Sequence, residues 1–167
     1  MPALYLIRHA IAAERGPKYP RDADRPLTSR GRRRMNDVVA GWRGLDTKPP
    51  AIDVILTSPF VRARATADIL ARGLDRKIPL ERYQPLAPGH APADAARALA
   101  KYKRAKAIAL VGHEPDLGKL AAWLIGAREP LQFKKGGVAR IDVPALPPAQ
   151  NGRLVWLATP KMLRSLA

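Results

Sequence analysis

The sequence predicts a three-layer α/β/α protein, in which helices cover both faces of a mostly parallel central sheet. Three short apolar runs, at residues 4–7, 52–57 and 105–111, have the length and composition of buried strands. Segments with helical spacing separate these runs, and this alternation is typical of parallel sheets. The chain of 167 residues has the length of one domain, and we expect residues 1–167 to form a single domain.

The first apolar run ends abruptly in Arg8 and His9. In open α/β sheets, ligands bind beyond the carboxyl ends of the strands. A guanidinium and an imidazole at that end are placed where a phosphate could dock and an imidazole could attack it. If residues 4–10 are considered alone, the alternative is that His9 is a partly buried histidine that caps a helix or loop.

The segment that follows, residues 12–27, is rich in Pro, Gly and charged residues and predicts a surface loop. Thr28 is the expected N-cap of the first helix, because an apolar stripe at helical spacing follows it. That stripe consists of Met35, Val38, Val39 and Trp42. We expect the helix to end at Gly44, Pro49 and Pro50.

The second strand, at 52–57, is followed by a helix that we expect over 60–74, with Thr57 or Ser58 as its cap. Arg62 falls in the first turn of this helix. A second arginine therefore lies close to a strand end and to a helix N-terminus, where anions are favoured.

The remaining elements continue the alternation. In order, we expect an edge strand at 77–82, an irregular segment at 83–92 that borders the site, a helix at 93–102, a strand at 105–111, a helix at 117–124, and a hairpin formed by 137–143 and 153–159. The strand at 105–111 runs into His113. Three separate strand ends thus bring two arginines and two histidines to one edge of the sheet: Arg8, His9, Arg62 and His113.

The composition excludes several kinds of site. The chain contains no cysteine, so disulfides, cysteine nucleophiles and thiolate metal sites are excluded. Its three histidines are not at the spacing of a helical zinc motif, and we expect no metal. No apolar run is long enough to span a membrane, and residues 1–7 are too short for the apolar core of a signal peptide. We therefore expect a cytoplasmic protein.

The unusual feature of the composition is its charge. Thirty Lys and Arg against fourteen Asp and Glu give a net charge of +16, which attracts acidic partners. The basic residues are dispersed from Arg8 to Arg164, with clusters only at 30–34 and 101–106. Aromatic residues make up 5% of the chain, which argues against direct nucleic-acid recognition by base stacking. An acidic partner, polyphosphate and solubility remain alternative reasons for the charge.

Two histidines and two arginines at one edge suit phosphoryl transfer. Arginines can hold the three equatorial oxygens of the transferred group, and this electrostatic positioning supplies most of the catalysis. One neutral imidazole can attack in line and form a phosphohistidine that water then hydrolyses. The other imidazole can donate a hydrogen bond to a phosphoryl oxygen.

Three motifs, in this order, resemble those of the histidine phosphatase superfamily, also called phosphoglycerate mutase-like. They are Leu6-Ile7-Arg8-His9-Ala10, with Ala10 where the family has glycine, then Thr57-Ser58-Pro59-Phe60-Val61-Arg62-Ala63-Arg64-Ala65-Thr66-Ala67, and Val111-Gly112-His113. The resemblance implies the phosphoglycerate mutase-like fold, His9 as nucleophile, and a phosphate pocket of Arg8, Arg62 and His113. It implies no metal or organic cofactor, because arginines supply the positive charge.

Within the superfamily, the chain is most similar to the small SixA-type phosphohistidine phosphatases. The similarity rests on the length and on Arg25-Pro26-Leu27-Thr28-Ser29-Arg30-Gly31, His113-Glu114-Pro115 and Thr159-Pro160-Lys161. It makes Arg25 a further candidate for the phosphate pocket, and Ser58 a candidate for substrate binding. The implied partner is a phosphohistidine-bearing protein of a phosphorelay.

The segment 84–92 contains no carboxylate, although mutases and many phosphomonoesterases of the superfamily carry an acidic proton donor there. An alkoxide leaving group needs a proton, whereas an imidazole titrates at about pH 6.5 and leaves readily. The segment therefore favours phosphohistidine over a sugar phosphate. His90, Asp22, Asp24 and Glu114 remain candidate proton donors, with a helix-capping role as the alternative for Glu114.

Three hypotheses follow. The first is a protein phosphohistidine phosphatase, and the second is a phosphatase of small phosphorylated molecules that uses the same His9 chemistry. The third is a basic module that binds polyanions without turnover.

Overall fold

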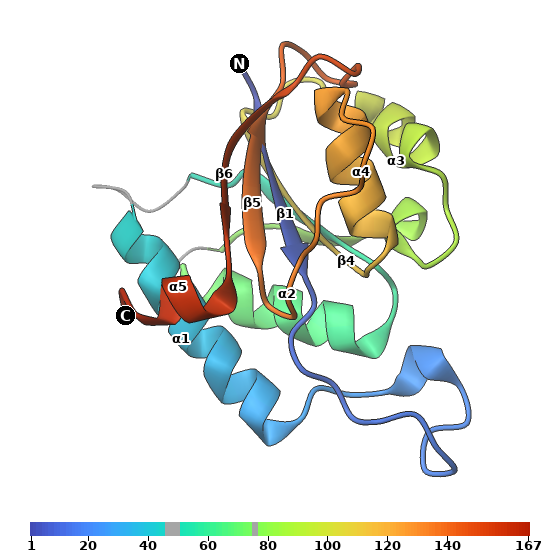
Figure 1. The fold of residues 1–167 in the computed structure, drawn as a ribbon, viewed down its shortest axis with the longest axis vertical. Coiled ribbons are helices and arrows are strands. Elements are labelled where there is room, and N and C mark those ends of the chain that lie inside the picture. Colours follow the sequence, from blue (N-terminus) through green and yellow to red (C-terminus); the bar gives the residue numbers. More distant parts are fainter. Residues whose placement is uncertain (46–50, 75–76) are drawn as a thin grey trace.

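The computed structural model describes residues 1–45, 51–74 and 77–167. Six strands form one sheet in the order β3-β2-β4-β1-β5-β6 (Figure 1). Their bounds are β1 Ala3–Arg8, β2 Val54–Thr57, β3 Leu80–Arg82, β4 Ala107–Gly112, β5 Val138–Asp142 and β6 Arg153–Ala158. Strands β1 to β4 are mutually parallel, and β5 runs antiparallel to both of its neighbours.

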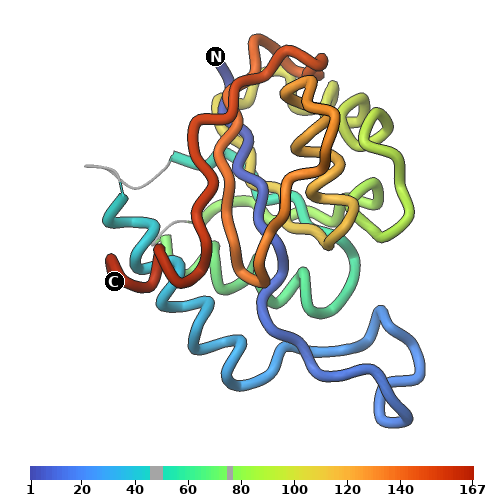
Figure 2. Tube along the Cα trace, viewed as in Figure 1, coloured from blue at the N-terminus to red at the C-terminus, as the bar shows by residue number. Residues whose placement is uncertain are grey.

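Helices cover both faces of this sheet, as the trace in Figure 2 also shows. Their bounds are α1 Ser29–Leu45, α2 Val61–Gly73, α3 Pro92–Ala98, α4 Asp116–Ile125 and α5 Pro160–Arg164. Helices α1, α2 and α5 pack on one face, and α3 and α4 pack on the other. The predicted three-layer α/β fold with a mostly parallel sheet is confirmed.

The core consists of two apolar clusters, one on each face of the sheet. Side chains alternate along β1, so that Tyr5 and Ile7 join the cluster under α1 and α2, while Leu4 and Leu6 join the cluster under α4. All four are buried. A strand covered on both faces must be apolar at every position, which is why the strands read as continuous apolar runs in the sequence.

Helix α1 begins as the sequence predicts. The backbone N–H of Gly31 donates to Oγ1 of Thr28 at 2.9 Å, and the predicted apolar stripe is buried. A Cβ at Gly31 would collide with the carbonyl oxygen of Ile11, and one at Gly41 would collide with that of Leu163. The two glycines therefore let α1 lie directly against the segment after β1 and against α5. The predicted stop at Pro49 and Pro50 lies outside the described residues.

The predicted cap of α2 is wrong. The N-cap is Phe60, which makes no capping hydrogen bond through its side chain, and Thr57 donates its hydroxyl to the carbonyl of Ser58. The helix begins at Val61, too far along the chain for Ser58 to cap it in the usual way. Instead the hydroxyl of Ser58 lies 2.7 Å from Nε2 of His113.

The other elements differ from expectation mainly at their ends. The helix expected over 93–102 is α3, followed by a 3-10 turn at Leu99–Tyr102. The edge strand and the final hairpin are present as β3 and as β5 with β6. Helix α5 was not predicted, although Thr159 caps it by accepting from the N–H of Met162, and Pro160 opens it.

Candidate active site

The carboxyl ends of β1, β2 and β4 bring the predicted residues together. In the sheet register Arg8 lies beside Gly112, and Thr57 lies beside Val111. The next residues along the three strands are His9, Ser58 and His113. The two imidazole rings are 5.1 Å apart, measured between centroids, and both histidines are buried.

His9 presents an unprotonated nitrogen toward Arg62. Its Nδ1 lies 2.7 Å from the carbonyl oxygen of Ala10, which can only accept, so Nδ1 carries the proton. Its Nε2 accepts a hydrogen bond from Nε of Arg62 at 3.3 Å. Burial, helped by the nearby charges of Arg62 and Arg8, lowers the pKa of His9 to about 4. At neutral pH the imidazole is therefore uncharged, and the lone pair of Nε2 is directed at Nε of Arg62.

Arg62 is oriented by contacts at both ends of its guanidinium. While Nε faces His9, Nη1 donates to the carbonyl oxygen of Asp22 at 2.7 Å and Nη2 donates to its Oδ2 at 2.9 Å. The side chain is 4% exposed, and it lies against the ring of Phe60. Asp22 thus holds the far end of the group and leaves the Nε edge directed at His9.

Asp22 is the junction of several cations in the loop before α1. It lies in a 3-10 turn at Asp22–Asp24, where its Oδ1 accepts from Nε of Arg25 at 2.8 Å and lies 3.3 Å from Arg15. Burial alone would raise the pKa of Asp22, but hydrogen bonds from Arg62 and Arg25 outweigh it and lower the pKa. Asp22 is therefore held ionised, which does not suit a proton donor at neutral pH.

Arg25 is connected to Arg62 by Asp22, which accepts hydrogen bonds from both arginines. Arg25 also donates from Nη1 to the carbonyl oxygen of Ala13 at 2.7 Å, and its side chain is mostly buried. Sequence reasoning missed the role of Asp22 in joining Arg25 to Arg62. The available signal was the position of Asp22, three residues before the arginine of the Arg25-Pro26-Leu27-Thr28 motif.

The other side of the site contains buried polar atoms without partners. Arg8 donates from Nη1 to the carbonyl oxygen of Phe133 at 2.7 Å. Within the described part of the chain, Nε of Arg8, Nδ1 of His113 and Oε1 of Glu114 are buried with no hydrogen-bond partner. Burial and then the neighbouring charges of His9 and Arg62 lower the pKa of His113 to about 3.

The remaining candidate proton donors have different surroundings. Asp24 is paired with Arg21 at 2.7 Å. Burial raises the pKa of Glu114, although the charge of Arg8 and the backbone N–H groups of Gly118 and Phe133 act in the opposite direction. The carboxylate lies against Gly118 in the first turn of α4, but the N-cap is Pro115 and no side chain caps the helix.

His90 lies on the irregular segment at 83–92, which borders the site as expected. It is half-buried and lines a small pocket together with His113 and Asp116. The backbone N–H of Gly89 donates to Oδ2 of Asp116 at 2.8 Å, which ties this segment to α4. His90 is therefore close enough to share a pocket with one of the two catalytic candidates.

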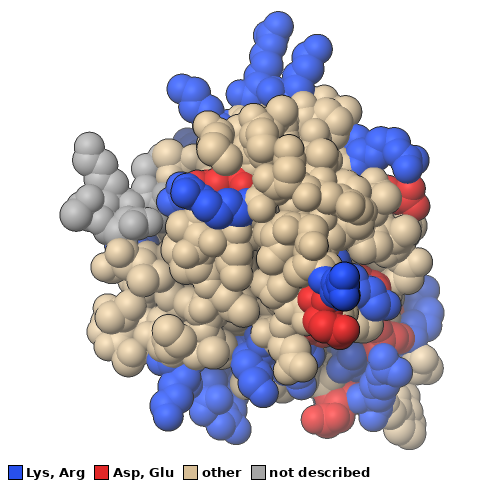
Figure 3. Space-filling model, turned by 45° about the horizontal axis from the view of Figure 1, so that its top comes forward, with Lys and Arg blue, Asp and Glu red and all other residues tan. Residues whose placement is uncertain are grey.

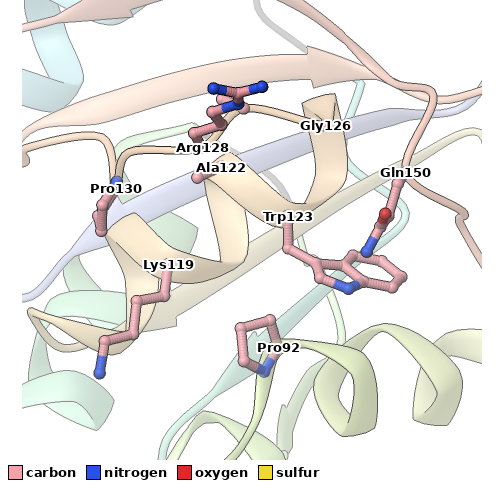
Figure 4. Close-up of a pocket in the computed structure, with 9 residues that line it drawn as sticks. Pro92, Lys119, Ala122, Trp123, Gly126, Arg128, Pro130 and Gln150 are labelled. Carbon is pink, nitrogen blue, oxygen red and sulfur yellow. The ribbon is translucent and has the colours of Figure 1, made fainter.

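A second hollow lies on α4 and shares Pro92 with the small pocket of His90 (Figure 4). Its lining includes Pro92, Lys119, Trp123 and Gln150, and none of the predicted site residues. No helix within residues 1–45, 51–74 and 77–167 has the length and apolar character that crossing a membrane requires. In the same ranges, no three His, Asp or Glu side chains gather in a way that could hold a metal ion.

Comparison with known proteins places the chain in a family. A model of the histidine phosphatase superfamily (branch 1) matches residues 4–87. An uncharacterised protein of Picosynechococcus sp. is 35% identical over 166 residues, which cover 96% of this chain and 98% of the relative. The chain belongs to the histidine phosphatase superfamily.

Solved structures share the fold of this superfamily member. The protein histidine phosphatase SixA complexed with tungstate is 23% identical, with 96% of this chain and 99% of SixA covered at a TM-score of 0.82. A proposed phosphohistidine phosphatase SixA from Agrobacterium tumefaciens is 25% identical, with 95% and 99% covered at 0.75. The α-ribazole phosphatase from Shigella flexneri is 18% identical, with 95% and 96% covered at 0.67. Family and neighbours together support a phosphatase.

Proposed function

We propose that this protein is a phosphohistidine phosphatase, that its substrate is a phosphorylated protein of a phosphorelay, and that residues 1–167 act as one domain. The observation that carries the proposal is the state of His9. Its Nδ1 proton is tied to the carbonyl of Ala10, and its Nε2 lone pair faces Arg62. A neutral, oriented imidazole beside an arginine is the arrangement that nucleophilic attack on a phosphoryl group requires.

In the proposed reaction, Nε2 of His9 attacks the phosphorus of the substrate. The bond from phosphorus to the substrate nitrogen breaks, and its electron pair stays with the leaving imidazole, which departs neutral because its other nitrogen carries a proton. Arg8, Arg62 and His113 hold the phosphoryl oxygens, with Ser58 and Arg25 as supporting residues. Water then attacks the phosphorus, the electron pair returns to Nε2, and phosphate leaves with the protons of water.

The carbonyl of Ala10 has a second role in this proposal. Phosphorylation of Nε2 makes the imidazole of His9 a cation, and the Nδ1–H···O bond of 2.7 Å stabilises that charge. The pKa of the free imidazole is lowered to about 4 by burial and nearby cations. The phosphorylated ring is therefore a good leaving group for the second step, in which it becomes neutral again.

The surroundings of Asp22 and Asp24 favour phosphohistidine as the substrate. Asp22 and Asp24 are both engaged by arginines, and Asp22 has a lowered pKa. A phosphoester would need a proton donor for its alkoxide, whereas the leaving imidazole already carries a proton on its other nitrogen and needs none from the enzyme. The similarity in fold to the protein histidine phosphatase SixA supports the same assignment.

A second candidate is a phosphatase of small phosphorylated molecules. The α-ribazole phosphatase shares the fold, and His90 shares a pocket with His113, where it could protonate an alkoxide. The third hypothesis, a polyanion-binding module without turnover, predicts no activity on any substrate.

Turnover measurements in metal-free buffer separate these candidates. The substrates are a histidine-phosphorylated phosphotransfer protein, p-nitrophenyl phosphate and a panel of phosphosugars, each tested with the wild type, His9→Ala and His90→Ala. We expect preference for the phosphoprotein, loss in His9→Ala, and little change in His90→Ala. Preference for a phosphoester, with loss in His90→Ala, would instead support the second candidate.

A further inference from the structure

Helix α1 carries a group of arginines near its N-terminus. Arg30, Arg33 and Arg34 line an open surface hollow together with Arg164 of α5. We call this surface the arginine hollow, and Asn36 and Asp37 complete its lining. Four cations against one carboxylate leave its charge strongly positive.

The arginine hollow lies at the same edge of the sheet as His9. The backbone N–H of Thr28 donates to the carbonyl of Ile11 at 3.0 Å, so the start of α1 lies against the segment two residues after His9. A second, smaller hollow is lined by Ala10, Lys135, Arg34 and Arg164, and it shares the last two residues with the first. Positive charge therefore continues from the neighbourhood of His9 to α1 and α5.

The charges of the arginine hollow are not compensated within the protein. In the part of the chain that the structure describes, Arg30, Arg33 and Arg34 form no ion pair, and the first turn of α1 contains no acidic residue. Cations near a helix N-terminus oppose the helix dipole, and they also repel one another. An acidic ligand would relieve both effects.

The second basic cluster of the chain lies elsewhere. Lys103, Arg104 and Lys106 precede β4, whereas His113 follows it, so this cluster is at the opposite edge of the sheet. On the face drawn in Figure 3, blue side chains stand at the top and along the lower margin, and the surface between them is mostly tan with two groups of blue and red atoms. This second cluster cannot touch a substrate held at His9 and α1, and it provides a matched control.

We propose that the arginine hollow is a docking surface for the acidic face of the protein that presents its phosphohistidine to His9. This inference rests on the proposed function. A folded protein domain that presents its phosphohistidine to His9 would also cover α1 and α5, because the smaller hollow beside Ala10 shares Arg34 and Arg164 with the arginine hollow. Charge complementarity of this kind mainly raises the rate of association and the specificity for the correct partner.

The test compares two variants with the same change of charge. One is Arg30→Glu/Arg33→Glu/Arg34→Glu, and the control is Lys103→Glu/Arg104→Glu/Lys106→Glu. The substrates are a histidine phosphotransfer domain of negative net charge, phosphorylated on its histidine, and free phosphohistidine, which has the same leaving group but no protein surface. Circular dichroism checks the fold of each variant, and Arg33→Glu alone replaces the triple variant if that does not fold.

We expect the α1 variant to lose about tenfold or more in kcat/KM on the phosphoprotein at low ionic strength, mainly through KM. The loss should shrink as salt is raised, because exposed charges are screened. Free phosphohistidine should be hydrolysed equally by all three proteins. An equal loss in both variants would show a general effect of net charge, and a loss on free phosphohistidine would show a role in the pocket itself. Either result overturns the proposal.

A binding measurement keeps the inference separate from the proposed function. If the wild type hydrolyses neither phosphohistidine substrate, the proposed function fails. The dissociation constant of the unphosphorylated acidic domain then decides the docking proposal. Weaker binding by the α1 variant alone supports it. Unchanged binding of the domain, with loss of inorganic polyphosphate binding instead, would assign the hollow to a different ligand and overturn it.

Discussion

The two sides of the candidate site differ in how completely their polar atoms are bonded. On one side, Arg62 donates to His9 and twice to Asp22. On the other side, Nε of Arg8 and Nδ1 of His113 are buried without partners among the described residues. The first side is organised before any ligand binds, whereas the second still has donors to offer.

This difference indicates how the two sides contribute. The bonded cluster holds the nucleophile and one arginine in place, so that little reorganisation is needed during the reaction, and its three hydrogen bonds leave N–H groups of Arg62 for the phosphoryl oxygens. An unpaired buried polar group costs about 1–3 kcal/mol, and that cost is recovered when a phosphoryl oxygen supplies the missing partner. We therefore expect the His9 side to determine reactivity and the Arg8 side to contribute to oxyanion binding.

The largest effect is expected from removal of the nucleophile. His9→Ala should lower kcat on phosphohistidine by about 10³-fold or more, because the variant lacks the nitrogen that accepts the phosphoryl group in the proposed reaction. Rapid-quench measurement with a labelled phosphoryl group should also show a phosphoenzyme in the wild type and none in His9→Ala. A variant that keeps a tenth of the wild-type rate would exclude His9 as nucleophile.

The next largest effect is expected on the side of the site where Arg62 contacts His9 and Asp22. Arg62→Lys keeps the charge but loses the planar fork that contacts His9 and Asp22, and we expect kcat to fall by about 10²–10³-fold. The matched control is Arg64→Lys on the same helix, where an exposed arginine pairs with Asp68 at 3.5 Å. Similar losses in both variants would mean that the contacts of Arg62 are unimportant.

The pH dependence of the reaction tests the protonation state of His9. The active form of His9 is neutral, and its pKa is lowered to about 4, so that form persists as the pH falls. At pH 5, an imidazole of ordinary pKa would be about 97% protonated, whereas His9 would remain mostly neutral, a difference of about thirtyfold in active enzyme. If kcat/KM decreased as the pH was lowered, with a midpoint near pH 6.5, the result would contradict a buried, neutral His9.

A smaller effect is expected when Asp22 is changed. Asp22→Asn keeps the carbonyl that accepts from Nη1 of Arg62 but loses the charge, and we expect about a tenfold lower kcat. Asp24→Asn is the control, since among the described residues Asp24 pairs with exposed Arg21 and not with Arg62. Inhibition constants for vanadate should rise in Asp22→Asn alone. An unchanged kcat would show that Asp22 does not position Arg62.

The smallest effect concerns the side with free donors. Ser58→Ala removes the hydroxyl 2.7 Å from Nε2 of His113, and it should lower kcat/KM by about three- to tenfold, the equivalent of one hydrogen bond. Because the ring of His113 still packs against the ring of Phe60, the variant should remain folded. If Ser58→Ala lost as much activity as Arg62→Lys, the two sides of the site would contribute equally to catalysis, contrary to the expected difference.

Much of the fold could be read from local patterns. The apolar runs at β1, β2 and β4 and the stripe of α1 predicted buried elements, because a two-sided sheet and an amphipathic helix impose those patterns. The cap of α2 was mispredicted because the hydroxyl of Ser58 lies against His113, 55 residues away, and accepts from the N–H of Phe60, which precedes the helix. Helix α5 was missed because five residues carry too little periodicity to identify a helix.

The candidate site divides in the same way. The strand-end rule was enough to bring Arg8, His9 and His113 to one edge, since parallel strands end together. The link from Arg62 to Asp22 spans 40 residues and joins a helix to an irregular loop, and no local pattern predicts such a contact.

The sequence by itself determined which reactive groups the protein has and at which strand ends they stand, because periodicity and chain order are local properties. The tertiary structure decided their chemical state. His9 is neutral with its proton on Nδ1, and Asp22 is ionised, because burial and partners from distant segments set the pKa and the hydrogen bonds of each group.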